Sequence, residues 1–364
     1  MEIETLDQLD VALATGSLRD RRLQNLDLAG REAGVLAVEV EGAIVLGGTT
    51  TPALDAHLHS GGALVFPAVT TCPVNPYRST LYSPDELYAG LDDGYEGTPD
   101  SLGYDWIRDA TGHHDVFATM LRAVHDDSVG DAFGEALEGR SVVGVMGGHA
   151  LHRGTDGFAT ASRLAREVAR SGHLVMTGGG PGAMEAANLG ARLAGADDDA
   201  LDDALARLAA VPGFTPDVRA WAQLGLAVAH DHPGGEVPAS IGVPTWHYGH
   251  EPPNVFADLV AKYFSNAVRE DSLLRSCNAG IVYLPGAAGT VQELFQAVTP
   301  GYYSPTGGVP LVLVGRAHWT TTLPVWPLLQ ALGAQRQLAN RVFLVDSAAE
   351  ALALLEEPVS PPRP

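Results

Sequence analysis

A glycine-rich turn followed by a carboxylate is the feature of this sequence best suited to chemistry. The turn begins the segment Leu284–Glu293 (LPGAAGTVQE), follows the apolar run 279–283, and leads into a stretch with helical periodicity, Thr290–Val298. Such a strand-to-helix turn directs backbone N–H groups and the positive end of a helix dipole toward one point, which suits a phosphate. The carboxylate of Glu293 is a poor phosphate ligand but a good partner for water, a hydroxyl or a developing cation. Together they predict chemistry on a phosphorylated sugar.

A second glycine-rich turn, Gly178–Gly182, follows the apolar run 173–177 and precedes Met184 and Glu185. Its glycines permit close approach of the backbone, and Pro181 suits an early helical position. We therefore expect this turn to lie close to the first one.

A third apolar run, 142–146, leads into Gly147, Gly148 and His149. Three strand–glycine–helix units predict an α/β fold, with a Rossmann-like parallel sheet flanked by helices and the loops gathered at the carboxyl ends of the strands. No G-x-G-x-x-G fingerprint with a later ribose-binding acid occurs in the usual arrangement, which argues against a nicotinamide dinucleotide.

The paired motifs resemble those of the LONELY GUY (LOG) family. Thr177–Asn188 (TGGGPGAMEAAN) and Pro285–Glu293 (PGAAGTVQE) carry the resemblance, which extends over roughly Ser141–Ser347; the family's second loop is written P-G-G-x-G-T-x-x-E. The resemblance implies a phosphoribohydrolase that splits a nucleoside 5′-monophosphate, with AMP or an N6-modified AMP expected, into free base and ribose 5-phosphate. It implies neither a metal nor an organic cofactor.

The resemblance also implies the site residues. Glu293 and Arg269 are the expected catalytic pair, although Glu270 stands where the family usually has lysine and Ala287 replaces the second loop glycine. The two turns are expected to bind substrate and phosphate through Gly178, Gly179, Gly180, Gly182, Met184, Glu185, Pro285, Gly286, Ala287, Ala288, Gly289 and Thr290. Further candidates are Gly148, His149 and Arg275, the last as a rival of Arg269.

Alternatives remain open at this stage. Ala287 and Glu270 are compatible with a protein that binds or senses a nucleotide without hydrolysing it, or that carries a phosphorylated pterin cofactor. An older label of the family, lysine decarboxylase, requires a lysine for a Schiff base. The one lysine, Lys262, lies in a stretch predicted to be helical, 257–267, without a glycine-rich context, which argues against that chemistry.

The amino-acid composition limits the classes of partner that we expect the protein to bind. The 364 residues include 22 basic and 44 acidic ones, for a formal net charge of −22, which argues against nucleic acid. Two cysteines give no disulfide framework. Without an apolar signal core or a run of about twenty apolar residues, the expectation is a cytoplasmic protein that does not enter membranes. By resemblance, we expect a homodimer or a larger even homo-oligomer.

The chain is predicted to have three regions. Residues 1–139 form an accessory N-terminal α+β region, and residues 140–357 form the Rossmann-like domain, with an acidic helical insertion at about 197–229. The tail, 358–364, is expected to be disordered.

Within the N-terminal region, 35–40 and 43–46 are predicted to form a hairpin or paired strands, and no internal repeat is evident. Asp55-Ala56-His57-Leu58-His59 matches the D-x-H-x-H start of amidohydrolase metal sites, but the further ligands are missing. We interpret its histidines as two polar residues on one side of a turn or strand.

Overall fold

The computed structural model describes residues 2–113, 115–248 and 251–356. The chain divides into two units, each made of two separate stretches of the sequence. The first comprises Met1–Leu81 and Asp105–Phe133, and the second comprises Tyr82–Tyr104 and Gly134–Pro364. Residues 82–104 therefore belong with the second unit, whereas the sequence analysis had a single boundary after residue 139. The predicted disorder of 358–364 lies outside the described residues.

The first unit contains a four-stranded, wholly parallel sheet in the order β1-β2-β3-β4. Its strands are β1 (Glu2–Ile3), β2 (Arg22–Gln24), β3 (Ile44–Leu46) and β4 (Leu64–Phe66). Partner residues Ile3, Leu23, Val45 and Val65 stand side by side, so successive strands are 20, 22 and 20 residues apart. The chain thus winds in a regular coil. This repeat of the backbone was not evident from the residue types.

The repeat is marked by left-handed backbone positions. Two residues before β2, β3 and β4 lie Asp20, Gly42 and Gly62, all with positive φ, and directly after β2 and β3 lie Asn25 and Gly47, also with positive φ. Glycine, and less often asparagine or aspartate, tolerates this conformation. The predicted hairpin at 35–46 was wrong because Gly42 redirects the chain into a parallel strand.

Helices α1 (Leu6–Ala14), α2 (Glu32–Leu36) and α3 (Pro52–Ser60) and the turn η1 (Ala29–Arg31) connect these strands around one hydrophobic core. The D-x-H-x-H residues lie in α3, so their assignment to a turn or strand was wrong. His57 Nε2 is 3.2 Å from the Val38 carbonyl oxygen, and His59 Nδ1 is 2.7 Å from that of Asp55. Both imidazoles therefore bind backbone.

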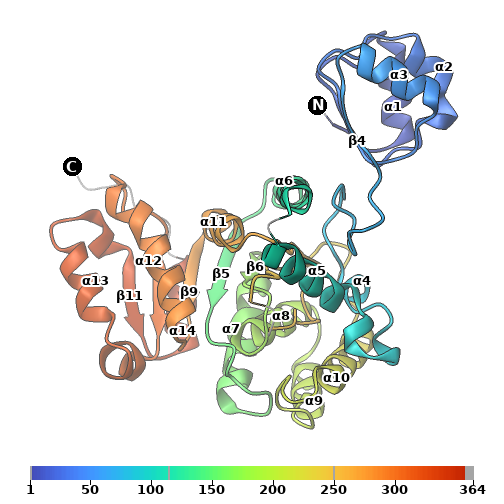
Figure 1. Cartoon of the computed structure of the whole chain (residues 1–364). Coiled ribbons are helices and arrows are strands. Elements are labelled where there is room, and N and C mark those ends of the chain that lie inside the picture. The colour runs from blue at the N-terminus through green and yellow to red at the C-terminus, as the bar shows by residue number, and fades with distance from the viewer. Residues whose placement is uncertain (1, 114, 249–250, 357–364) are drawn as a thin grey trace. The chain divides into compact units, whose positions relative to one another are not determined.

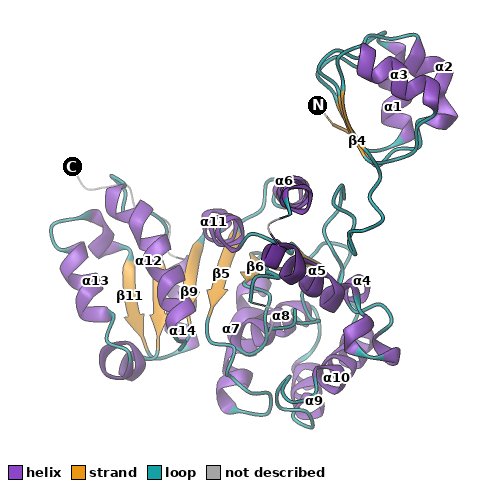
Figure 2. Ribbon diagram, viewed as in Figure 1, coloured by secondary structure: helices purple, strands orange, loops and turns teal. Residues whose placement is uncertain are grey.

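The second unit is built on a seven-stranded parallel sheet in the order β11-β10-β9-β5-β6-β7-β8 (Figures 1 and 2). This confirms the predicted α/β fold with a Rossmann-like parallel sheet. The strands are β5 (Val142–Met146), β6 (Leu174–Thr177), β7 (Ser240–Gly242), β8 (Leu259–Val260), β9 (Gly280–Tyr283), β10 (Leu311–Val314) and β11 (Val342–Val345).

Helices accompany the sheet on both sides, as the purple ribbons of Figure 2 show. The remaining helices and helical turns of the chain are α4 (Pro84–Leu87), η2 (Leu91–Asp93), η3 (Tyr95–Gly97), α5 (Pro99–His113), α6 (Val116–Ala136), α7 (Asp156–Arg170), α8 (Ala183–Arg192), α9 (Asp198–Leu208), α10 (Val218–Asp231), α11 (Asn266–Ser276), α12 (Ala288–Tyr303), the π-helical turn η4 (His318–Thr322), α13 (Trp326–Gly333), η5 (Gln337–Asn340) and α14 (Ala348–Glu356). The predicted helical insertion corresponds to α9 and α10. None of the described helices is long and apolar enough to cross a membrane.

The predicted helix at 257–267 was wrong. Strand β8 occupies Leu259–Val260, and α11 begins only at Asn266. A short apolar run cannot be assigned to strand or helix by periodicity alone. Lys262, just after β8, is 2% exposed, ion-paired with Asp100, and 4.9 Å from the centre of the Trp246 ring. The side chain of Lys262 therefore takes part in the packing of the core through this ion pair and this ring contact.

Strand order reverses at β5, which has β9 on one side and β6 on the other. In open parallel sheets, ligands bind in the crevice outside the carboxyl ends of the strands at such a reversal. The loops after β5, β6 and β9 are therefore the place to look for a site.

The coiled path of the chain in the first unit predicts that the stability of this unit depends strongly on Gly48. A methyl group there would lie 2.0 Å from the Leu26 carbonyl oxygen, whereas at Gly16, which has nearly the same φ, it would meet nothing within 4 Å. We expect Gly16→Ala to cost about 1–2 kcal/mol from backbone strain alone and Gly48→Ala to cost more than about 3 kcal/mol. Hydrogen exchange of the β2 and β3 amides measures both, and equal losses would contradict the steric argument.

Candidate functional site

The three loops at the strand reversal interlock through their backbones. Gly148 N–H donates to the Pro285 carbonyl at 3.1 Å, and Ala183 N–H donates to the Gly148 carbonyl, also at 3.1 Å. A methyl group on Gly182 would lie 2.6 Å from the Gly148 oxygen, and one on Gly148 would lie 3.3 Å from Gly286 Cα. The predicted glycines Gly148, Gly182 and Gly286 are thus brought together, and their lack of side chains allows it.

Glu293 and Arg269 form an ion pair beside these loops. Arg269 Nη1 lies 3.1 Å from Glu293 Oε1, with side-chain exposures of 8% and 13%. Arg269 Nη2 donates to Asn266 Oδ1 at 3.0 Å, while its Nε is buried and finds no hydrogen-bond partner in the described part of the chain. A methyl group on Gly178 would lie 3.7 Å from Arg269 Nη1 and 4.0 Å from Glu293 Oε1. The two sequence motifs therefore meet at this pair.

Glu270, the residue that replaces the family's lysine, is buried next to the pair. Its carboxylate accepts from Asn266 Nδ2 at 2.9 Å and from Gln292 Nε2 at 2.6 Å. Burial raises the pKa of Glu293; Arg269 opposes this, and the charges of Glu270 and Glu251 add to it. Glu293 consequently holds its proton to a higher pH than an ordinary glutamate, as suits a residue that exchanges protons.

The start of α12 is accessible and has no side-chain cap. Ala287 occupies the N-cap position, so helix α12 begins earlier than the predicted Thr290. Residues Pro285, Ala287, Ala288 and Gly289 are exposed, whereas Thr290 is 5% exposed and its Oγ1 would lie 2.2 Å from a methyl group on Gly286. N–H groups of the first helical turn lack partners within the helix, so they can receive an anion.

A buried polar network, missed by the sequence analysis, holds the Gly178–Gly182 turn. Asn254 Nδ2 donates to the Gly180 carbonyl at 3.1 Å and to Asn188 Oδ1 at 2.9 Å, and Thr177 Oγ1 donates to the same Asn188 oxygen at 2.8 Å. Asn254 N–H reaches the Gly179 carbonyl at 2.8 Å. Asn254 is distant in sequence from the turn, so no local pattern could have identified it.

Met184 supports the same turn from α8. Methyl groups on Gly178 and Gly180 would lie 2.8 Å from its Sδ and 2.9 Å from its Cε, respectively. On the other side, Glu251 Oε2 would lie 3.5 Å from the Gly180 methyl, and Glu251 Oε1 is 2.9 Å from His149 Nδ1. His149 is therefore at the edge of the site, and Glu251 was not predicted.

Glu185 and Arg275 lie apart from the Arg269–Glu293 pair. Glu185 is 1% exposed and accepts from Arg153 Nε at 2.7 Å, and Arg153 Nη1 donates to the Trp221 carbonyl at 3.1 Å. Arg275 is 77% exposed and bonded to Asp271 at 2.8 Å; six residues after Arg269, it points to another side of α11. Glu185 anchors α8 to the neighbouring loop, and Arg275 faces solvent.

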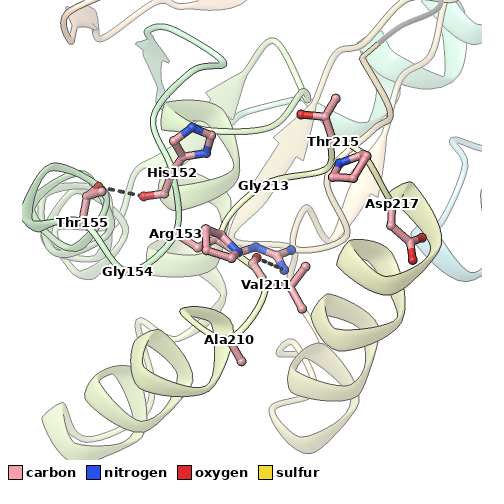
Figure 3. Close-up of a pocket in the computed structure, with 11 residues that line it drawn as sticks. His152, Arg153, Gly154, Thr155, Ala210, Val211, Gly213, Thr215 and Asp217 are labelled. Carbon is pink, nitrogen blue, oxygen red and sulfur yellow. Dashed lines mark hydrogen bonds between the residues drawn. The ribbon is translucent and has the colours of Figure 1, made fainter.

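A cavity of about 480 Å³ lies away from the ion pair, between the loop after β5 and the α9–α10 connection (Figure 3). Three of its polar side chains are engaged elsewhere: Thr155 caps α7, Asp217 caps α10, and Arg153 holds Glu185. We therefore place the candidate site at the interlocked loops and interpret the cavity as a packing junction. Within the described residues, no group of three or more histidine, cysteine or acidic side chains is arranged to hold a metal ion.

One comparison with protein families matches part of the chain. Residues 140–197, which span β5 to α8, match the SLOG cluster4 family. This segment contains the Gly178–Gly182 turn but not Arg269 or Glu293, so the match does not reach the LOG family specifically. No match was found among the curated proteins.

Several solved structures are similar. They include the molybdenum cofactor binding protein of Rippkaea orientalis (18% identity, 60% of this chain and 96% of that chain, TM-score 0.37), the molybdenum cofactor carrier protein of Chlamydomonas reinhardtii (19%, 59% and 95%, 0.37) and TM1055 (20%, 60% and 98%, 0.38). At these identities and TM-scores, the similarities carry no argument about ligand or activity.

The ion pair of Glu185 yields a stability prediction. Glu185→Gln leaves the Arg153 guanidinium buried without its counter-charge, which typically costs about 3–5 kcal/mol. As control, Arg163→Gln breaks the exposed pair with Asp202 (2.8 Å) and should cost less than about 1 kcal/mol. Urea unfolding followed by tryptophan fluorescence reports both, since Trp221 lies 4.7 Å from the Arg153 guanidinium. Equal, small losses would show that Glu185 is not a structural anchor.

Proposed function

We propose that the protein hydrolyses the N-glycosidic bond of a nucleoside 5′-monophosphate, AMP or an N6-modified AMP first among the candidates. The observation that carries the proposal is the Arg269–Glu293 pair, 3.1 Å apart and next to Gly178, beside an uncapped helix start. A phosphate at the start of α12 would bring the ribose toward the Glu293 carboxylate.

The chemistry follows from the charges. Cleavage of the C1′–N bond builds positive charge on the ribose, which a buried carboxylate stabilises. Glu293 would accept a proton from the attacking water as the water oxygen bonds to C1′ and the C1′–N bond breaks, and the departing nitrogen would take up a proton from the solvent. Arg269 would keep Glu293 in position through Nη1, and its buried Nε, which lacks a partner in the described residues, is available to a substrate oxygen. In this proposal, hydrolysis requires neither a metal nor an organic cofactor.

A second candidate function is nucleotide binding, or cofactor carriage, without hydrolysis. Its specific support is Glu270, whose buried carboxylate adds a second negative charge beside Arg269, at 4.0 Å from Nη2. That charge opposes ionisation of Glu293, so in this function the site holds a ligand without an active base. Retention of bound nucleotide with no free base released would favour this function.

Other parts of the proposal rest on sequence resemblance. A homodimer or larger even homo-oligomer is proposed on that ground. A cytoplasmic location is proposed because residues 1–13 are acidic and no run of about twenty apolar residues occurs, and nucleic acid is not proposed as a partner because the net charge is −22.

The first test is turnover. The purified protein is incubated with AMP, N6-modified AMP, GMP, CMP and UMP, and free base and ribose 5-phosphate are measured. Glu293→Ala should lower kcat by at least about 100-fold, a typical loss for a general acid or base, while nucleotide binding persists. Gln296→Ala, about one turn of α12 further along, is the matched control and should retain activity. Undiminished turnover in Glu293→Ala would reject the mechanism.

The pH profile tests the raised pKa of Glu293. As a base it must be deprotonated, so activity should rise with pH through its pKa. Glu270→Gln removes a like charge that raises this pKa, so the acidic limb should move to lower pH. Asp271→Asn, at an exposed neighbouring position on α11, should leave the limb in place. A limb that stays fixed in Glu270→Gln would show that another group controls it.

A further inference from the structure

His318, which no sequence motif singled out, lies against the phosphate-binding turn. It begins η4, shortly after β10, and its Nε2 lies 3.1 Å from the Gly286 carbonyl oxygen and 3.4 Å from the Gly286 nitrogen. One ring nitrogen thus reaches both polar groups of a glycine in the second motif. Because a single imidazole nitrogen either donates or accepts, only one of these two hydrogen bonds forms at a time.

The position of His318 is fixed by its surroundings. The adjacent Trp319 is fully buried, its Nε1 donates to the Val314 carbonyl at 2.9 Å, and its ring meets the imidazole edge-on with centroids 4.6 Å apart. The His318 carbonyl accepts from Leu323 N–H at 2.7 Å. The imidazole is therefore held beside the turn by a buried anchor.

The two possible hydrogen bonds have different consequences for an anion. If Nε2 accepts from Gly286 N–H, that donor is withdrawn from the start of α12. If Nε2 carries a proton and donates to the Gly286 carbonyl, the Gly286 N–H loses the imidazole as its acceptor. The second contact, at 3.1 Å, is within the usual range for a hydrogen bond, while the first, at 3.4 Å, is longer and weaker.

We propose that His318 is a positioning residue for the turn that binds the phosphate group. With phosphate bound, Nε2 carries a proton and donates to the Gly286 carbonyl, which fixes the peptide and leaves Gly286 N–H to the phosphate. Arg316, the charged residue nearest to His318 in the sequence, forms an exposed ion pair with Asp346 at 3.3 Å. This inference rests on the proposed function for the location of the phosphate, but not on hydrolysis.

Ribose 5-phosphate is the suitable probe because it carries the phosphate and sugar without a base and has no N-glycosidic bond to hydrolyse. Calorimetry should give roughly tenfold weaker binding to His318→Ala, the loss expected for a hydrogen bond that serves a charged ligand. His318→Gln, whose amide can donate to the same carbonyl, should recover part of the affinity. Thr321→Ala, an exposed position in the same η4 turn, is the matched control and should bind like the unchanged protein.

A spectroscopic signature separates this role from general support of the fold. In ¹⁵N-histidine-labelled protein, the resonance absent from His318→Ala identifies His318. Ribose 5-phosphate should shift its Nε2 signal toward that of a ring nitrogen that carries a proton. Ribose without phosphate should not. Unchanged affinity in His318→Ala, an Nε2 signal that does not respond, or failure of the unchanged protein to bind ribose 5-phosphate would each overturn the inference. The proposed function fails separately, if no nucleotide releases its base while ribose 5-phosphate still binds.

Discussion

The close approach of three backbone turns is the constraint on which the candidate site depends. Gly148 lies between Gly182 and Gly286, and a methyl group on any of these would meet a neighbour at 2.2–3.3 Å. Gly148 can therefore bond directly to Pro285 in one loop and to Ala183 after the other. This interlocking brings the start of α8 and the start of α12 to one edge of the sheet, so Gly178 comes within contact distance of an ion pair formed by two later helices.

Charge sets the second constraint. In a chain with net charge −22, the buried guanidinium at the site, that of Arg269, has the carboxylates of Glu293 and Glu270 beside it. Backbone N–H groups can attract an anion without adding a side-chain cation, because their dipoles are fixed by the fold. The uncapped start of α12 therefore matters more here than it would in a basic protein.

The sequence predicted those elements whose pattern is local and strong. The apolar runs before the glycine turns became β5, β6 and β9 with boundaries close to those expected. The coil of the first unit was not predicted because its strands have only two or three residues. Its repeat also lies in the backbone conformation at Asp20, Gly42 and Gly62 rather than in a repeated side-chain motif. Asn254 and His318 reach the glycine turns only through folding, so spacing along the chain could not predict them.

Two acids of the same local pattern show why motif position alone does not assign a role. Glu185 and Glu293 each follow a glycine turn and lie in the first two turns of a helix. Glu185 meets Arg153, whose remaining contacts are backbone carbonyls and the Trp221 ring, so the pair is enclosed. Glu293 meets Arg269, whose Nε has no partner in the described residues, and it retains 13% exposure beside an accessible loop. The partner and the access are both tertiary properties: they enclose Glu185 in a buried ion pair and leave Glu293 partly accessible.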